Sequence, residues 1–185
     1  SNAVASIRRH GFEAEPNGVD VEAVMQAGGA NPHSVRWLTR QLIAGLAPLF
    51  DALAEASATA ELIVGAGAQV PAASVAEWRD VPYVTAVFCP CAIPSSEIPP
   101  PTVRTQTLPR WVNRLLWQAG SPIADLLLRS AVNRGRTRLG LRPIDDPVTQ
   151  LMNGPVIVAA DPDLAPLPAD RPDAAIGTDA WILDG

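Results

Sequence analysis

The residues of this chain that could take part in acid–base or nucleophilic chemistry are few and poorly placed for it. His10 and His33 have no serine or cysteine near them in the sequence, and we expect both at the surface. Cys89 follows an apolar run, but no histidine lies near it to activate the thiol. The aspartates of Asp145-Asp146 and Asp161-x-Asp163 lie beside prolines, where turns and caps are their usual roles. The residues by themselves therefore predict no catalytic group and no metal site.

Cys89 and Cys91 are the two cysteines, and a single proline separates them. Two thiolates are too few for the four ligands of a structural zinc site. At this separation we also expect no relaxed disulfide between them. Reduced thiols are typical of intracellular proteins, so the cysteine usage predicts a cytoplasmic location.

The segment 65–70, Gly-Ala-Gly-Ala-Gln-Val, lies between an apolar run and a helical pattern, as a dinucleotide-binding loop would. The match is incomplete, because Val70 stands at the third glycine position and no acidic residue ends the next predicted strand to hold a ribose. The segment also fails as a nucleophile elbow, because Gly67 stands where a serine is required. We expect a tight strand-to-helix turn here.

The composition argues against two further classes of protein. The chain has 185 residues, and its 14 arginines, with no lysine, face 19 acidic residues for a net charge of −5. Proteins that bind nucleic acid usually carry a basic excess, so we expect no nucleic-acid partner. Charged and polar residues interrupt every apolar stretch before it reaches about 18 residues, and we expect no membrane span. The first residues lack the pattern of a secretion signal, and Ser1, Asn2 and Ala3 resemble an expression scar.

Hydrophobic periodicity predicts helices and strands that alternate along the chain. The predicted helices are a short one around Ile7 and longer ones at 35–56, 72–78, 110–119 and 122–139, with Pro48 kinking or dividing the second and Gly140 ending the last. The predicted strands are 62–64, buried on both faces, then 82–88, 155–160 and 174–177, with a weaker strand at 11–16. This alternation predicts an α/β fold, a Rossmann-like doubly wound parallel sheet with helices on both faces.

A proline-rich loop between residues 90 and 109 precedes the two tryptophans of the next predicted helix. Trp111 and Trp117 are six residues apart and cannot point the same way on a regular helix. One reading makes the loop and the tryptophans a wall for a large, partly apolar ligand. The other makes the prolines a stiff surface loop and packs both tryptophans inside. The residues alone favour neither.

Four segments, taken in order, resemble a known family. They are Val-Phe-Cys-Pro-Cys-Ala-Ile-Pro-Ser at 87–95 with three prolines at 99–101, Leu-Gly-Leu-Arg-Pro at 139–143, Val-Ala-Ala-Asp-Pro at 158–162, and Gly-Thr-Asp-Ala-Trp-Ile-Leu at 177–183. Together they resemble the N-terminal domain of GT-B glycosyltransferases of the family 1 and family 28 type. The bacterial natural-product enzymes of the vancomycin group are similar in pattern, with the sterol glucosyltransferase-like branch nearby.

The resemblance implies an acceptor-binding domain over residues 4–178 and the start of an interdomain linker over 179–185. It implies transfer of a hexose from a UDP- or TDP-sugar to a natural-product, lipid or sterol-like acceptor, in antibiotic or related biosynthesis. The family's first strand, catalytic loop, second strand and donor domain have no counterpart here. We therefore expect no catalytic residue, no cofactor held by this chain and no transfer by it alone. The alternative is a non-catalytic small-molecule-binding or auxiliary module derived from such an enzyme.

The resemblance also implies a wall for a hydrophobic acceptor. By position, this wall consists of Gln69, Phe88, Pro90, Ser95, Ser96, Trp111 and Trp117. Its amide and hydroxyl groups could hydrogen-bond a ligand, and its aromatic rings could stack on one. Loss of a central strand would leave unpaired strand edges, so we expect the remaining strands to close up or to pair with a second copy in a homodimer.

Overall fold

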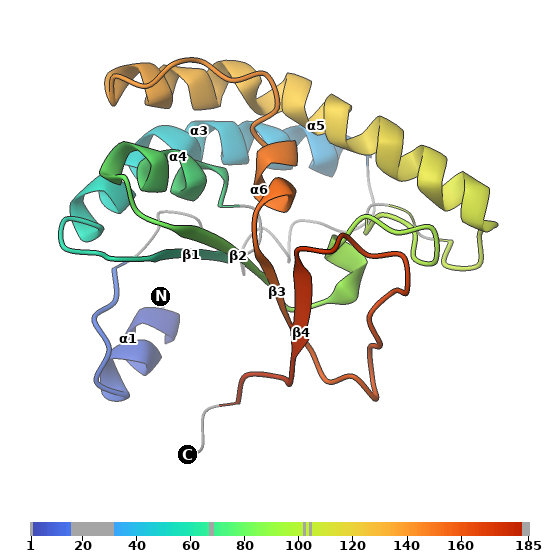
Figure 1. The fold of residues 1–185 in the computed structure, drawn as a ribbon. Helices are drawn as coiled ribbons and strands as arrows, with labels where there is room; N and C mark the ends of the chain where they lie inside the picture. Colours follow the sequence, from blue (N-terminus) through green and yellow to red (C-terminus); the bar gives the residue numbers. More distant parts are fainter. Residues whose placement is uncertain (1, 16–31, 67–68, 102, 104, 183–185) are drawn as a thin grey trace.

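The fold is built around a four-stranded sheet. The computed structural model describes residues 2–15, 32–66, 69–101, 103 and 105–182. The strands are β1 (Ile63–Ala66), β2 (Tyr83–Val87), β3 (Val156–Ala159) and β4 (Ala175–Thr178), and they lie in the order β1-β2-β3-β4 with every neighbouring pair parallel (Figure 1). The predicted α/β class and Rossmann-like parallel sheet are confirmed. The register pairs Ile63 with Tyr83 and Val156 with Ala175, so the side chains of each such pair share one face of the sheet.

Helices flank this sheet. They are α1 (Asn2–Arg9), α3 (Pro32–Ala56), α4 (Val70–Arg79), the 3-10 helix η1 (Pro90–Ala92), α5 (Arg110–Arg138) and α6 (Thr149–Asn153). In Figure 1, α3, α4, α5 and α6 lie above the sheet, and α1 lies below β1. No helix among the described residues is both long enough and apolar enough to cross a bilayer.

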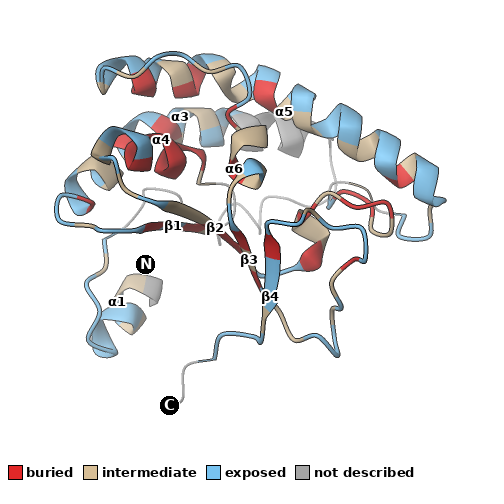
Figure 2. Cartoon of the chain, in the orientation of Figure 1, coloured by how far each residue is buried: buried red, intermediate tan, exposed pale blue. Residues whose placement is uncertain are grey.

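Two clusters of buried side chains hold the helices to the sheet. The first joins α3, α4, α5 and α6 to β1, and its centre includes Phe50, Val75 and Val132. The second joins β2, β3 and β4 to the turn after β2 through Val87, Ile93, Val156, Val158 and Ala175. Burial alternates along β1, whereas the last three residues of β2 are all buried, and Figure 2 colours the buried residues of the sheet and helices red. The prediction that the first strand is buried on both faces is wrong, because Val64 is 47% exposed.

Several predicted boundaries differ from the structure. The helices predicted at 110–119 and 122–139 form one helix, α5, that runs through Pro122, and α3 likewise continues through Pro48. A proline removes one helical hydrogen bond, but the part of α5 after Pro122 packs in the first cluster, and the part before it is fastened to the proline-rich loop by hydrogen bonds from Asn113 and Trp117. Gly140 adopts a φ of 77° directly after α5, which confirms the predicted helix end.

The segment predicted as a weak strand at 11–16 is not a strand in the described residues 11–15. Phe12 is 58% exposed, and Arg8 in α1 donates hydrogen bonds to Ala14 O, so the segment turns back on α1 instead of joining the sheet. The strands β1 to β4 form a continuous ladder whose edges are β1 and β4. Pairing of two copies through these edges stays a prediction, which light scattering on the purified chain would test.

Candidate functional site

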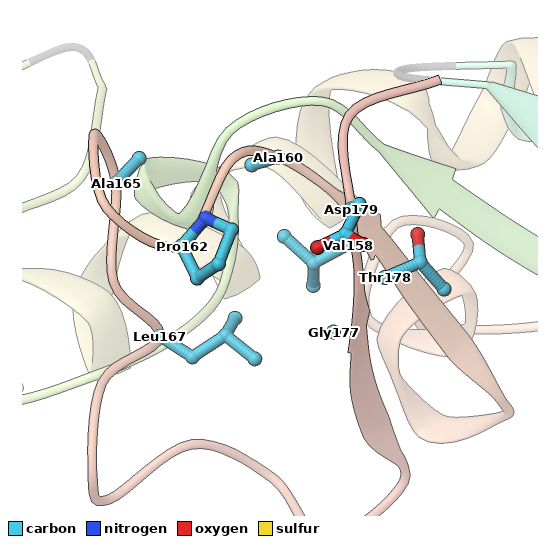
Figure 3. A pocket seen from close by; sticks show the side chains of 8 residues that line it. All are labelled: Val158, Ala160, Pro162, Ala165, Leu167, Gly177, Thr178 and Asp179. Atoms are coloured by element: carbon cyan, nitrogen blue, oxygen red, sulfur yellow. The ribbon is translucent and has the colours of Figure 1, made fainter. Parts of the chain in front are cut away.

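The carboxyl ends of the four parallel strands meet at one edge of the sheet, where α/β proteins usually bind ligands. A cavity of about 430 Å³ opens there, beyond β3 and β4. Its lining residues are Val158, Ala160, Pro162, Ala165, Leu167, Gly177, Thr178 and Asp179 (Figure 3). The lining side chains are mostly apolar, but polar and apolar atoms contribute about equally to the surface of the cavity, and Asp179 adds a carboxylate.

The cavity depends on how the chain turns after β3. The backbone oxygen of Asp161 accepts from Ala165 N at 2.9 Å, and this turn carries the chain towards Leu167. A Cβ atom on Gly177 would lie 2.6 Å from Leu167 Cδ1, so the absence of a side chain there gives Leu167 its place in the wall. Gly177 and Leu167 together set the width of the cavity.

A second hollow of about 280 Å³ adjoins the first and shares Pro162 and Asp179 with it. Asp161, Asp163, Ala180 and Ile182 line the rest of this hollow. The three aspartates give the rim a negative charge, and none of them lies in an ion pair within the described part of the chain. The negative charge of the rim disfavours a phosphorylated ligand at this edge.

Aromatic side chains border the same edge. Phe88 follows β2 directly, is 59% exposed, and meets Trp181 edge to face with ring centroids 5.9 Å apart. Trp181 was missed as a site residue by the sequence reasoning, because nothing in the sequence shows that the segment after β4 returns to the end of β2. The pair links two segments that border the carboxyl edge.

The two tryptophans of α5 point in different directions, as predicted. Trp117 Nε1 donates to Ile98 O at 2.9 Å and so fastens α5 to the proline-rich loop. Trp111 is 70% exposed and lies in an outward row of exposed apolar residues that continues to Leu115 and Leu126. Of the two, Trp117 therefore has a structural partner and Trp111 is accessible.

The remaining predicted wall residues lie before α4 and after β2. Gln69 is half-buried directly before α4, and Pro90 is buried in η1. Ser95 and Ser96 are buried and hold the carboxylate of Asp170: Ser95 Oγ donates to Oδ1 at 2.7 Å and Ser96 N donates to Oδ2 at 2.8 Å. The serines thus connect the proline-rich loop to the segment before β4.

This network gives Asp170 an unusual acidity. Hydrogen bonds from Ser96 and Ser95 hold the pKa of Asp170 at about 2, below its ordinary value of 3.8. A lowered pKa in the folded state stabilises the fold above pH 4, and this contribution is lost as the pH falls from about 4 through about 2.

We expect Asp170→Asn to remove this contribution, which solvent screening limits to about 1 kcal/mol because the carboxylate is exposed. Urea unfolding between pH 2 and pH 6 measures it. The stability difference between the natural chain and the variant should be largest near pH 6 and should shrink as the pH falls towards 2. If the stability difference between the two proteins does not change with pH, the lowered pKa of Asp170 does not stabilise the fold.

The structure corrects the prediction that the two thiols are reduced. The Sγ atoms of Cys89 and Cys91 are bonded as a disulfide, and the Cα atoms are 5.2 Å apart, within the usual range. The reason is local: Cys89 is extended, and the 3-10 turn that begins at Pro90 folds Cys91 back towards it.

The predicted turn role is confirmed for Asp161, whose Oδ1 accepts from Asp163 N at 2.9 Å. Asp145 instead forms an ion pair with Arg129 at 3.4 Å. Across residues 2–15, 32–66, 69–101, 103 and 105–182, no group of three or more histidine, cysteine, aspartate or glutamate side chains could hold a metal ion. His10 Nδ1 lies 2.9 Å from Ser6 O within the α1 segment, away from the cavity.

Comparison with known proteins agrees with the resemblance seen in the sequence. No family model matches the chain. Glycosyltransferase GtfC of Amycolatopsis orientalis is 30% identical over 171 residues, which are 91% of this chain and 41% of GtfC. Vancomycin aglycone glucosyltransferase of the same organism is 31% identical over 172 residues, or 91% of this chain and 42% of that protein. Glycosyltransferase GtfE is 31% identical over 162 residues, or 85% and 39%. The chain thus spans about two fifths of the length of these relatives.

Proposed function

We propose that this chain is the acceptor-binding part of a glycosyltransferase that transfers a hexose from a UDP- or TDP-sugar to a natural-product or lipid-like acceptor. The similarity to three glycosyltransferases over most of the chain supports glycosyl transfer as the reaction class. The observation that carries the acceptor role is the cavity at the carboxyl edge of the sheet, which combines apolar side chains with polar groups that include the carboxylate of Asp179.

The cavity fits a hydrophobic, hydroxylated molecule. The side chains of Val158 and Leu167 offer apolar contact area, and the carboxylate of Asp179 can accept a hydrogen bond from a ligand hydroxyl. The neighbouring pair Phe88 and Trp181 gives an aromatic edge on which rings can stack. These residues bind and orient an acceptor, and transfer requires further groups.

The same charges argue against a nucleotide sugar at this place. Transfer needs cations or helix N-termini to stabilise the leaving diphosphate. The rim instead brings together Asp161, Asp163 and Asp179, which repel a diphosphate. We propose that the donor binds outside this cavity and that the 185-residue chain alone does not transfer sugar.

Isothermal titration with vancomycin aglycone, a sterol, UDP-glucose and TDP-glucose tests this function. We expect an aglycone or a sterol to bind and the nucleotide sugars not to bind. Gly177→Ala should weaken acceptor binding about fivefold, because the new methyl group meets Leu167 and narrows the cavity. The matched control is Gly154→Ala, since nothing lies within 4 Å of a Cβ at Gly154.

Three results would contradict the proposal. They are tighter binding of a nucleotide sugar than of every acceptor, equal affinities for the Gly177→Ala and Gly154→Ala variants, and turnover of a nucleotide sugar by the purified chain. Acceptor binding by a full-length protein that performs no transfer would instead favour a non-catalytic binding module.

A further inference from the structure

The disulfide between Cys89 and Cys91 lies in an exposed turn with buried residues on both sides. Val87 at the end of β2 is 3% exposed, and Ile93 after η1 is fully buried. Between them Cys89 is exposed and Cys91 is half-buried, while Cys91 N donates to Cys89 Sγ at 3.3 Å. Small molecules in solution can therefore reach the disulfide while the flanking residues stay anchored in the core.

This disulfide is poorly placed to stabilise the fold. A disulfide restrains the unfolded chain according to the length of the loop that it closes, and here a single residue, Pro90, lies between the cysteines. Other interactions already hold the residues next to the disulfide in place, since Ile93 is packed in the core and the Ser95 hydroxyl donates a hydrogen bond to Asp170. Exposed disulfides that are not structural staples are the ones that exchange with thiols.

We propose that Cys89 and Cys91 form a reversible thiol–disulfide exchange site whose reaction partner is a low-molecular-weight thiol. The thiolate of the small molecule attacks Cys89 Sγ, because Cys89 is the more exposed of the two. The protein S–S bond breaks, a mixed disulfide forms on Cys89, and Cys91 leaves as a thiolate and takes up a proton.

A second molecule of the small thiol completes the reduction. Its thiolate attacks the small-molecule sulfur of the mixed disulfide, so that Cys89 leaves as a thiolate and is protonated. The two small thiols are oxidised to their disulfide by loss of two electrons, and the protein disulfide is reduced to two thiols. The same steps in reverse close the disulfide when the small-molecule disulfide is in excess.

The site borders the carboxyl edge of the sheet but does not depend on the proposed function. Phe88 directly precedes Cys89 and contacts Trp181. Opening the disulfide therefore acts on the turn at 88–92 that carries Phe88, while the buried residues Val87 and Ile93 limit the change on either side. The exchange chemistry can be measured without any acceptor or nucleotide sugar.

The test equilibrates the purified chain in a series of reduced and oxidised glutathione mixtures, starting from both the reduced and the oxidised protein. Acid quenching, alkylation and mass spectrometry then count the free thiols. We expect about nine tenths dithiol in the most reducing mixture and about nine tenths disulfide in the most oxidising one, with the same curve from both directions. Circular dichroism should show the same helix content at both ends.

Two single variants compare how accessible the two sulfurs are, which is the basis for assigning the first attack to Cys89. With oxidised glutathione, Cys91→Ser leaves Cys89 to form the mixed disulfide, and Cys89→Ser leaves Cys91. We expect the adduct on Cys89 to form at least about fivefold faster, because access to the sulfur controls the rate. A disulfide that persists in every mixture, or one that never forms, would overturn the proposal. Equal adduct rates, or a faster reaction at Cys91, would overturn the assignment of Cys89 as the attacked sulfur.

Discussion

Replacing Arg136 with alanine is expected to lower the free energy of unfolding by about 3 kcal/mol. The Arg136 side chain is 2% exposed, and its guanidinium donates to Glu77 Oε2 at 2.7 Å and to Glu77 Oε1 at 3.0 Å. It also donates to Ser74 Oγ and to Arg142 O, so it joins α5 to α4 and to the segment that follows α5. The variant leaves these acceptors without their donor and leaves a void between the two helices.

The exposure of Glu77 limits the loss of stability in the Arg136→Ala variant. The Glu77 side chain is 44% exposed, so water can hydrate its carboxylate when the arginine is absent. Arg138→Ala is the matched control on the same helix. Its ion pair with Asp51 has a shortest distance of 3.3 Å, and the two side chains are 49% and 69% exposed, so we expect a loss of about 0.5 kcal/mol or less. Urea unfolding measures both variants. Equal stabilities would show that Arg136 does not hold α5 to α4.

Gly135→Ala is expected to destabilise the fold by about 2 kcal/mol, although alanine is the better helix former. A Cβ atom at Gly135 would overlap the ring of Phe50. Phe50 is 1% exposed in the cluster between α3 and α5, so the ring has no solvent-facing space into which it could move. The chain needs glycine at this position because the two helices approach closely there.

Gly120→Ala, in the same helix, should have the opposite effect. Nothing lies within 4 Å of a Cβ at Gly120, and we expect alanine there to raise the stability by up to about 1 kcal/mol through its helix propensity. Thermal unfolding measures whether each variant is more or less stable than the unsubstituted chain, and we expect the two changes in stability to have opposite signs. If thermal unfolding shows that both variants stabilise, the close contact between Gly135 and Phe50 does not restrict the fold.

The elements that depend on local sequence were predictable. Apolar runs such as Val156–Ala159 become strands, and Gly140 ends α5 because its positive φ is costly for other residues. The sequence-based prediction was wrong at Pro122. Proline usually interrupts a helix, so two helices were predicted there, but α5 runs through this residue. Tertiary contacts of α5 on both sides of Pro122, with the first cluster after it and with the proline-rich loop before it, outweigh the one hydrogen bond that proline removes.

The candidate site was predictable only in part. The resemblance directed attention to residues 69–117, but every residue that lines the cavity lies in β3, in β4 or in the segments that follow them. Ser95 was expected to face a ligand, and its hydroxyl instead donates to Asp170, which is 75 residues further along the chain. Trp181, which follows β4, contacts Phe88, which follows β2, and this contact also joins segments that are far apart in the sequence.

The sequence by itself determined the class of the fold, because hydrophobic periodicity and turn residues act between close neighbours in the chain. The alternation of apolar strands and amphipathic helices was enough for a parallel α/β sheet, and the acidic composition was enough to argue against a nucleic-acid partner. The tertiary structure alone decided which side chains share a cavity and which hydrogen bonds occupy the serines. It also decided that Cys91 turns back to meet Cys89. These outcomes depend on contacts between distant segments and on backbone geometry, which no local pattern records.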